Sequence, residues 1–165
     1  MSENNTTVQG QLDEARKALK NGNFNKAENI LWVIVNSNAK ALGLESVSKH
    51  EQLVECQKNS IMELGQLYHD QKNTEKLLKL ISSARDIMKN AFAKSKTTRV
   101  IKDLIDFVDD LGTDNATDLT IQVTKESIEW AIEQKRTFLR QSLQVRLSGL
   151  YYKKKSHQNA LTLIN

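Results

Sequence analysis

Apolar residues recur along this chain every three or four positions, and short polar turns separate the periodic stretches. This spacing places one apolar face on each stretch, which is the pattern of amphipathic helices. It predicts helices over about 9–21, 24–40, 48–70, 74–92, 96–111, 119–133, 137–154 and 157–165. The intervening turns are NGN at 21–23, DQKN at 70–73 and GTDNATD at 112–118. With no proline, six glycines and 5% aromatic residues among 165, the composition also favours an all-α fold.

Two stretches carry parts of a helix-pair repeat signature. Gly22, Phe24 and Ala27 have the G-x-F-x-x-A arrangement of a tetratricopeptide turn, with a glycine at the turn, an aromatic wedge and a small residue between the two helices. The L-G-x-x-Y half of the same signature is formed by Leu64, Gly65 and Tyr68.

A third copy is predicted near the end of the chain. Leu147, Ser148 and Tyr151 have the L-small-x-x-Y spacing, and His157 and Ala160 follow where the first copy has its phenylalanine and alanine. Because each helix pair leaves an apolar face that only a neighbouring pair covers, we expect a right-handed solenoid of irregular tetratricopeptide-like helix pairs. The alternative is a bundle of unrelated amphipathic helices.

No long linker or low-complexity tract divides the chain, so the pattern predicts one structural unit. We expect a disordered N-terminus at 1–8 and a helical-repeat arm at 9–165. The helix beginning at 157 has only started when the sequence stops, which predicts truncation before further repeats.

Charge is distributed unevenly along the chain. No acid follows Glu133, whereas residues 134–165 contain seven of the 24 Lys and Arg residues. Residues 1–133 contain the other 17 bases and all 20 acids. Around the KRTFLRQSL stretch at 135–143, an antiparallel helix pair predicts Glu129 opposite Arg140 and Glu126 near Arg146. We interpret these charges as links within the fold, and a contact with a partner protein is the alternative.

The helix predicted at 137–154 has three faces. Two are expected to be covered, a leucine stripe and a second stripe of small and apolar residues, while the third is open and uncharged. The second stripe consists of Phe138, Ser142, Val145 and Gly149.

The chain lacks the residue patterns of catalysis, metal binding and membrane insertion. His50, His69 and His157 are far apart, and the single cysteine, Cys56, leaves no zinc cluster. Phosphate-loop, dinucleotide-binding and nucleophile-elbow motifs are missing. The longest apolar run, ILWVIV at 30–35, is too short to span a membrane. We therefore expect a non-enzymatic protein without cofactor or metal, located in the cytoplasm and nucleus.

Several stretches resemble a known family. SIEWAIEQKRTFLRQSLQVRLSGLYYKKKSHQNALTLIN, ILWVIV, IMELGQLY and AKSKTTRVIKDLIDFVDDL are similar to the N-terminal part of the non-ATPase regulatory subunit 11 family of the 26S proteasome lid. The resemblance extends from about Leu12 to the end. It implies further repeats and a C-terminal PCI domain beyond this sequence.

The resemblance also implies a scaffold function in ubiquitin-dependent protein degradation. In that family the N-terminal arm clamps the lid and the ATPase base to an α subunit of the proteolytic core. The partners it implies are other lid subunits, a core α subunit and an ATPase subunit, without nucleic acid or membrane. Alternatives are a PCI subunit of the signalosome, a nucleic-acid-binding helical repeat and a free-standing peptide-binding tetratricopeptide module.

The early helices offer candidate contact residues for such a partner. Arg16, Lys17, Lys20 and Lys26 lie farthest from the end that would face the lid. The alternative interpretation is an ordinary solvated face.

Overall fold

The computed structural model describes residues 7–164, of which 160 and 162–164 are described by their backbone only. This part of the chain is all-α, as the sequence predicts. Its helices are α1 (Val8–Lys20), α2 (Phe24–Val35), α3 (Val47–Asp70), α4 (Thr74–Ala91), α5 (Lys94–Asp109), α6 (Ala116–Glu133) and α7 (Thr137–Ile164). The predicted disorder at 1–8 falls largely outside the described residues, but Thr7 caps α1 and Val8 begins it.

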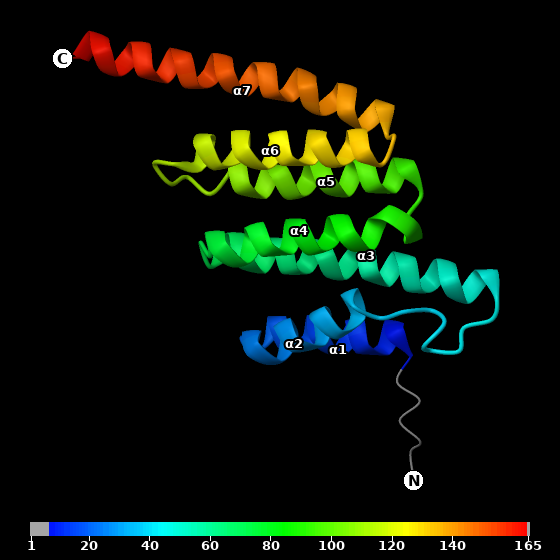
Figure 1. Ribbon diagram of the computed structural model, residues 1–165. Helices are drawn as coiled ribbons and strands as arrows, with labels where there is room; N and C mark the ends of the chain where they lie inside the picture. Colours follow the sequence, from blue (N-terminus) through cyan, green and yellow to red (C-terminus); the bar gives the residue numbers. More distant parts are fainter. Residues whose placement is uncertain (1–6, 165) are drawn as a thin grey trace.

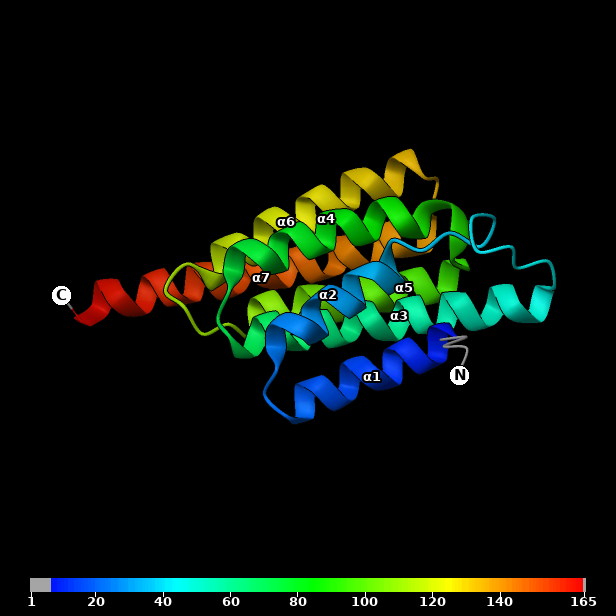
Figure 2. The ribbon, with the colours of Figure 1, turned by 90° about the horizontal axis from the view of Figure 1, so that it is seen from below.

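The helices form a stack of antiparallel pairs. The pairs α1–α2, α3–α4 and α5–α6 lie one above another, and α7 covers the last of them (Figure 1). Each odd-numbered helix also contacts the next one, α1 with α3, α3 with α5 and α5 with α7. Viewed from below, α2, α4 and α6 lie toward one side of the molecule and α1 toward the other (Figure 2). This arrangement agrees with a solenoid of helix pairs, and its handedness stays a prediction.

Three of the turns between helices share one backbone geometry. At the α1–α2 turn, Gly22 adopts φ +77°, and the amide of Asn23 donates to the carbonyl of Ala18. Lys72 and Lys135 adopt φ 55° at the corresponding positions after α3 and α6. This is the Schellman ending of a helix, in which a left-handed residue lets the chain reverse directly into the next helix.

The motif residues of the first two copies are mostly buried as predicted. Ala27 and Leu64 are inaccessible to solvent, and Tyr68 is 1% exposed. Phe24 is 45% exposed, so its predicted role as a wedge is wrong. It is the first residue of α2, at the edge of the stack, where its ring is only partly covered.

The predicted third copy is also wrong. No turn separates 137–154 from 157–165, because α7 continues through them as one helix of 28 residues. The segment KKKSHQ contains no glycine or proline, so nothing local ends the helix. Tyr151 is half-exposed beside Lys125, unlike the buried Tyr68. The side chain of Ala160 lies outside the described residues.

Gly65 allows the second and third helix pairs to approach each other. A Cβ at this position would lie 2.7 Å from Cε2 of Phe107 and 3.3 Å from Cδ2 of Leu104, both on α5. The small residue of the predicted L-G-x-x-Y motif is therefore required by the contact between α3 and α5.

We predict that Gly65→Ala lowers the free energy of unfolding by about 1–3 kcal/mol, because the added methyl group forces α5 away from α3. Gly149→Ala is the matched control, since no atom lies within 4 Å of the position and the residue is helical. It should stabilise the chain by about 0.5–1 kcal/mol. Urea unfolding of both variants measures the difference, and equal effects would contradict this role of Gly65.

Candidate functional site

A partly buried polar network joins the first helix pair to the second. The indole Nε1 of Trp32 on α2 donates to the hydroxyl of Tyr68 on α3 at 2.8 Å, and that hydroxyl donates to Glu28 at 2.8 Å. Lys76 on α4 donates to the same carboxylate at 2.9 Å. Burial raises the pKa of Glu28, but the hydrogen bonds from Lys76 and Tyr68 outweigh it and hold the pKa below its ordinary value. The network therefore keeps a charged carboxylate at the junction of α2, α3 and α4.

We predict that Tyr68→Phe destabilises the chain by about 1–3 kcal/mol, because the Trp32 N–H and the Glu28 carboxylate both lose a partner. Tyr152→Phe removes the same hydroxyl from a ring that is 75% exposed and should change stability by less than about 0.5 kcal/mol. Urea unfolding at neutral pH compares the two variants. Equal losses would show that the network does not hold the pairs together.

Ion pairs bridge every step of the stack. Each of them joins a helix of one pair to a helix of the next layer of the stack. The bridges are Arg16–Glu63 (α1–α3), Lys76–Glu28 (α2–α4), Lys96–Glu55 (α3–α5), Arg85–Glu126 (α4–α6), Arg146–Asp106 (α5–α7) and Lys153–Asp109 (α5–α7). Exposed pairs of this kind contribute only about 0–1 kcal/mol each, so they fix the register of a stack that apolar burial holds together.

The predicted partners of the arginines in α7 are wrong, although Arg146 does form a link within the fold. Arg146 pairs with Asp106 on α5, and Glu126 pairs with Arg85 on α4. Arg140 and Glu129 form no ion pair among the described residues. The helix period predicts the face of α7 on which an arginine lies, but not which neighbouring helix provides its acid. Because α7 packs against both α5 and α6, Arg146 finds its partner on α5. Lys154 also pairs, with Asp118 at 2.8 Å.

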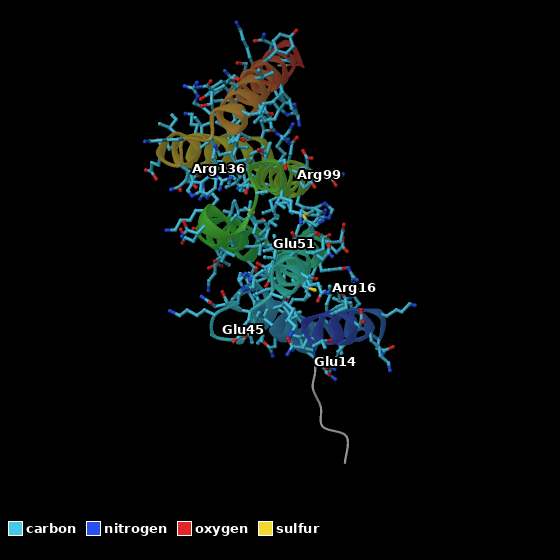
Figure 3. The ribbon with its side chains drawn as sticks, turned by 90° about the vertical axis from the view of Figure 1, so that its right-hand side faces the viewer. Glu14, Arg16, Glu45, Glu51, Arg99 and Arg136 are labelled. Carbon is cyan, nitrogen blue, oxygen red and sulfur yellow. The ribbon has the colours of Figure 1, made fainter. Side chains whose placement is uncertain are left out.

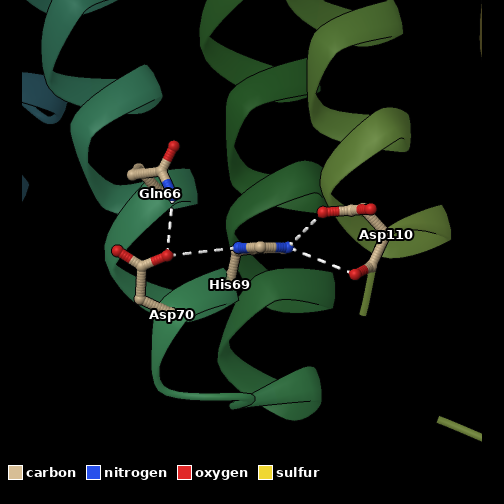
Figure 4. Close-up of polar contacts among 4 residues, drawn as sticks. All are labelled: Gln66, His69, Asp70 and Asp110. Atoms are coloured by element: carbon tan, nitrogen blue, oxygen red, sulfur yellow. Dashed lines mark hydrogen bonds and ion pairs between the residues drawn. The ribbon is translucent and has the colours of Figure 1, made fainter. Parts of the chain in front are cut away.

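A histidine connects the ends of α3 and α5 (Figure 4). Nδ1 of His69 lies 3.2 Å from the carboxylate of Asp70, and Nε2 lies 2.9 Å from that of Asp110. Gln66 donates to Asp70 at 2.7 Å and orients it. Burial and the nearby Lys72 lower the pKa of His69, but the hydrogen bonds to Asp70 and Asp110 outweigh them and raise it.

The raised pKa predicts that this contact stabilises the fold most at acidic pH. A group whose pKa is higher in the folded state than in the unfolded state stabilises the fold fully at pH values below its unfolded pKa, which for histidine is about 6.5. This stabilisation is lost as the pH rises through the pKa of the folded state. His69→Gln should therefore cost more stability at about pH 5.5 than at about pH 8.5 in urea unfolding. In an Asp110→Asn background, the cost of His69→Gln should differ less between these two pH values. A cost that is independent of pH would contradict a charged His69.

The four candidate contact residues divide into two groups. Arg16 pairs with Glu63 at 3.0 Å, and Lys26 pairs with Glu14 at 3.3 Å, so both have roles within the fold. Lys17 and Lys20 are exposed in the last turn of α1 and form no ion pair among the described residues. Only these two remain available to a partner.

A basic cleft that the sequence did not indicate lies between the starts of α5 and α7. It has a volume of about 640 Å³ and is lined by Lys94, Arg99, Lys102, Lys135 and Arg136, with Asp103 and Phe138 beside them. The two helix starts are about 40 residues apart in the chain, so local patterning did not connect them. The KSKTTRVIK segment at 94–102 was the available signal, because its bases recur within a few residues of one another.

Arg136 is the buried member of this cleft. It is 8% exposed, and its Nη2 donates to the carbonyls of Met88 and Lys89 at the end of α4. Its guanidinium lies 5.3 Å from the centre of the Trp130 ring. Nη1 has no hydrogen-bond partner, and burial lowers the pKa of the group.

The second stripe of α7 is not covered as predicted. Phe138 and Val145 are 74% and 75% exposed, and Gly149 has open space around it. In the structure α7 packs through its leucine stripe alone, because α5 and α6 both lie on that side. Leu139 and Leu143 are fully buried there.

Other chemistry is sparse in the described part of the chain. Cys56 is buried, and burial raises the pKa of its thiol. Among residues 7–164, no cluster of three or more His, Cys, Asp or Glu side chains is arranged to hold a metal ion. No described helix is long and apolar enough to cross a membrane.

Stacked antiparallel pairs with ion pairs between successive layers define a helical-repeat protein. Comparison with known families then identifies the family: the chain belongs to that of the N-terminal domain of 26S proteasome regulatory subunit RPN6, whose model matches residues 8–154. The family that the sequence resembles is thereby confirmed.

Individual relatives agree with the family match. The chain is 35% identical over 156 residues to the 26S proteasome regulatory subunit RPN6 of Saccharomyces cerevisiae, which covers 94% of this chain and 35% of the relative. It is 33% identical over 154 residues to the probable 26S proteasome regulatory subunit rpn6 of Schizosaccharomyces pombe, and this match covers 93% of this chain and 34% of the relative. It is 32% identical over 122 residues to the 26S proteasome non-ATPase regulatory subunit 11 homolog of Arabidopsis thaliana, and this match covers 74% of this chain and 28% of the relative. The chain thus spans about a third of these relatives. No solved structure matches it significantly.

Proposed function

We propose that this chain is the N-terminal helical arm of a proteasome lid subunit and serves as a non-catalytic scaffold. In this proposal the arm clamps the lid and the ATPase base to the proteolytic core and so supports ubiquitin-dependent degradation. The family match over residues 8–154 carries the proposal, because the relatives that share it are named as 26S proteasome regulatory subunits. The same names favour the proteasome over the signalosome alternative.

The fold supports a scaffold because contacts join its helix pairs at every step of the stack. A clamp must hold two bodies in a fixed relation, and here every step of the stack combines apolar burial with at least one ion pair that fixes its register. The contact with the core then needs only a modest polar patch, since tethering through the rest of the lid raises the effective concentration of a weak site.

The proposed partners are other lid subunits, an α subunit of the core and an ATPase subunit, in the cytoplasm and nucleus. Lys17 and Lys20 are the proposed contact with the core, because they are exposed and unpaired at the α1 end. Nucleic acid is disfavoured as a partner. Three of the seven bases that motivated it, Arg146, Lys153 and Lys154, pair with acids of α5 and α6 and present no continuous track for phosphates.

Retention of the tagged chain on immobilised proteolytic core, ATPase base and tRNA tests this proposal at low and moderate salt. We expect selective retention on core or base. Lys17→Glu/Lys20→Glu should reduce retention on the core several-fold because it reverses the proposed contact. The matched control Lys40→Glu/Lys49→Glu makes the same charge change at exposed positions away from α1. Retention on tRNA alone, or equal losses in both variants, would contradict the clamp.

A further inference from the structure

The basic cleft between α5 and α7 collects positive charge that the fold itself does not neutralise. Elsewhere in the stack, cations on α1, α2, α4 and α7 pair with acids of neighbouring helices. Within residues 7–164, the five basic residues of the cleft form no ion pair, and Asp103 is the sole acid in its lining. Like charges held together without counterions destabilise a fold slightly, so this grouping indicates a binding surface.

Two further observations indicate that the cleft receives an anion. The start of α5 opens into it, and its cap residue, Ala93, provides no side-chain hydrogen bond to the free amides. Arg136 is more than nine-tenths buried in the cleft lining, yet its Nη1 has no partner. Nη1 itself is closed to solvent, but the positive charge of the buried guanidinium has no acid beside it, and such a charge favours an anion in the neighbouring cleft. Figure 3 shows Arg99 and Arg136 at a similar height in the stack, below α7.

The size and lining of the cleft favour a peptide over a small anion or a nucleic acid. A volume of about 640 Å³ far exceeds the space that one phosphate occupies. Phe138 presents a ring that is 74% exposed at the same place, and it offers an apolar contact that a free anion does not use. Beyond the cleft, Arg146, Lys153 and Lys154 of α7 pair with acids of α5 and α6, which interrupts the charged track that a nucleic acid follows.

We propose that this cleft binds an acidic segment of a partner protein. Carboxylates of the segment contact Arg99, Lys102 and Lys135, and an apolar side chain packs on Phe138. The proposal goes beyond the clamp, since it assigns a second contact surface at the opposite part of the stack from Lys17 and Lys20. The proposal that the cleft binds an acidic segment can be tested whether or not the chain contacts the proteolytic core.

Fluorescence anisotropy with a labelled peptide of repeating Glu-Glu-Leu triplets tests the proposal, and the matching Gln-Gln-Leu peptide is the uncharged control. The acidic peptide should bind with an affinity that falls as salt rises, and the Gln peptide should not bind. Arg99→Glu/Lys102→Glu should weaken binding about tenfold or more, and Phe138→Ala several-fold. Lys17→Glu/Lys20→Glu carries the same charge change and should leave peptide binding unchanged.

Amide chemical shifts of the unaltered chain provide a second measurement that does not depend on the folding of a variant. Titration with the acidic peptide should move the resonances of Ser95, Arg99 and Phe138 and leave those of α1 in place. The proposal is overturned if no acidic peptide binds, if the Gln peptide binds equally, or if both double variants weaken binding alike. Binding of pyrophosphate or an oligonucleotide at Arg99 and Lys102 without peptide binding would also overturn it.

Discussion

The architecture depends on burying both sides of α3. This helix contacts α1 and α2 on one side and α4 and α5 on the other, so it joins the first three pairs. Two residues near its end make this possible. Gly65 leaves room for Phe107 of α5, and Tyr68 connects Trp32 and Glu28 of α2 to the second pair. A side chain at Gly65, or loss of the Tyr68 hydroxyl, is therefore expected to weaken the packing between successive helix pairs.

Charge has two distinct roles in this fold. Along the length of the stack, ion pairs link helices of successive layers and contribute little stability individually. The basic final segment is part of this system, because three of its bases find their acids on α5 and α6. The five basic residues that line the cleft are different, since no acid of the described chain forms an ion pair with them. The uneven charge of the sequence therefore reflects internal pairing in one region and an open basic surface in another.

Sequence periodicity predicted α1 to α6 and the turn at Gly22, because both depend on neighbours in the chain, but it extended α2 beyond Val35 and divided α7 into two helices. The repeat signature also identified Ala27, Leu64 and Tyr68, all three of which are buried in the structure. It failed where the outcome depends on which helices become neighbours. The acid that pairs with Arg146 comes from α5, the outer stripe of α7 is left open, and Phe24 lies at the edge of the stack. The basic cleft escaped prediction for the same reason, since its two sides are distant in sequence.

The proposed clamp function requires that α3 unite the described helices into one cooperative unit. Native-state hydrogen exchange measures this directly, amide by amide, as a function of denaturant. If α3 unites the layers, the buried amides of α2, α3 and α5 will exchange through one common opening, with the free energy of global unfolding. Exchange of the α1–α2 pair through a separate opening of much lower free energy, while α3–α6 stays protected, would contradict this account.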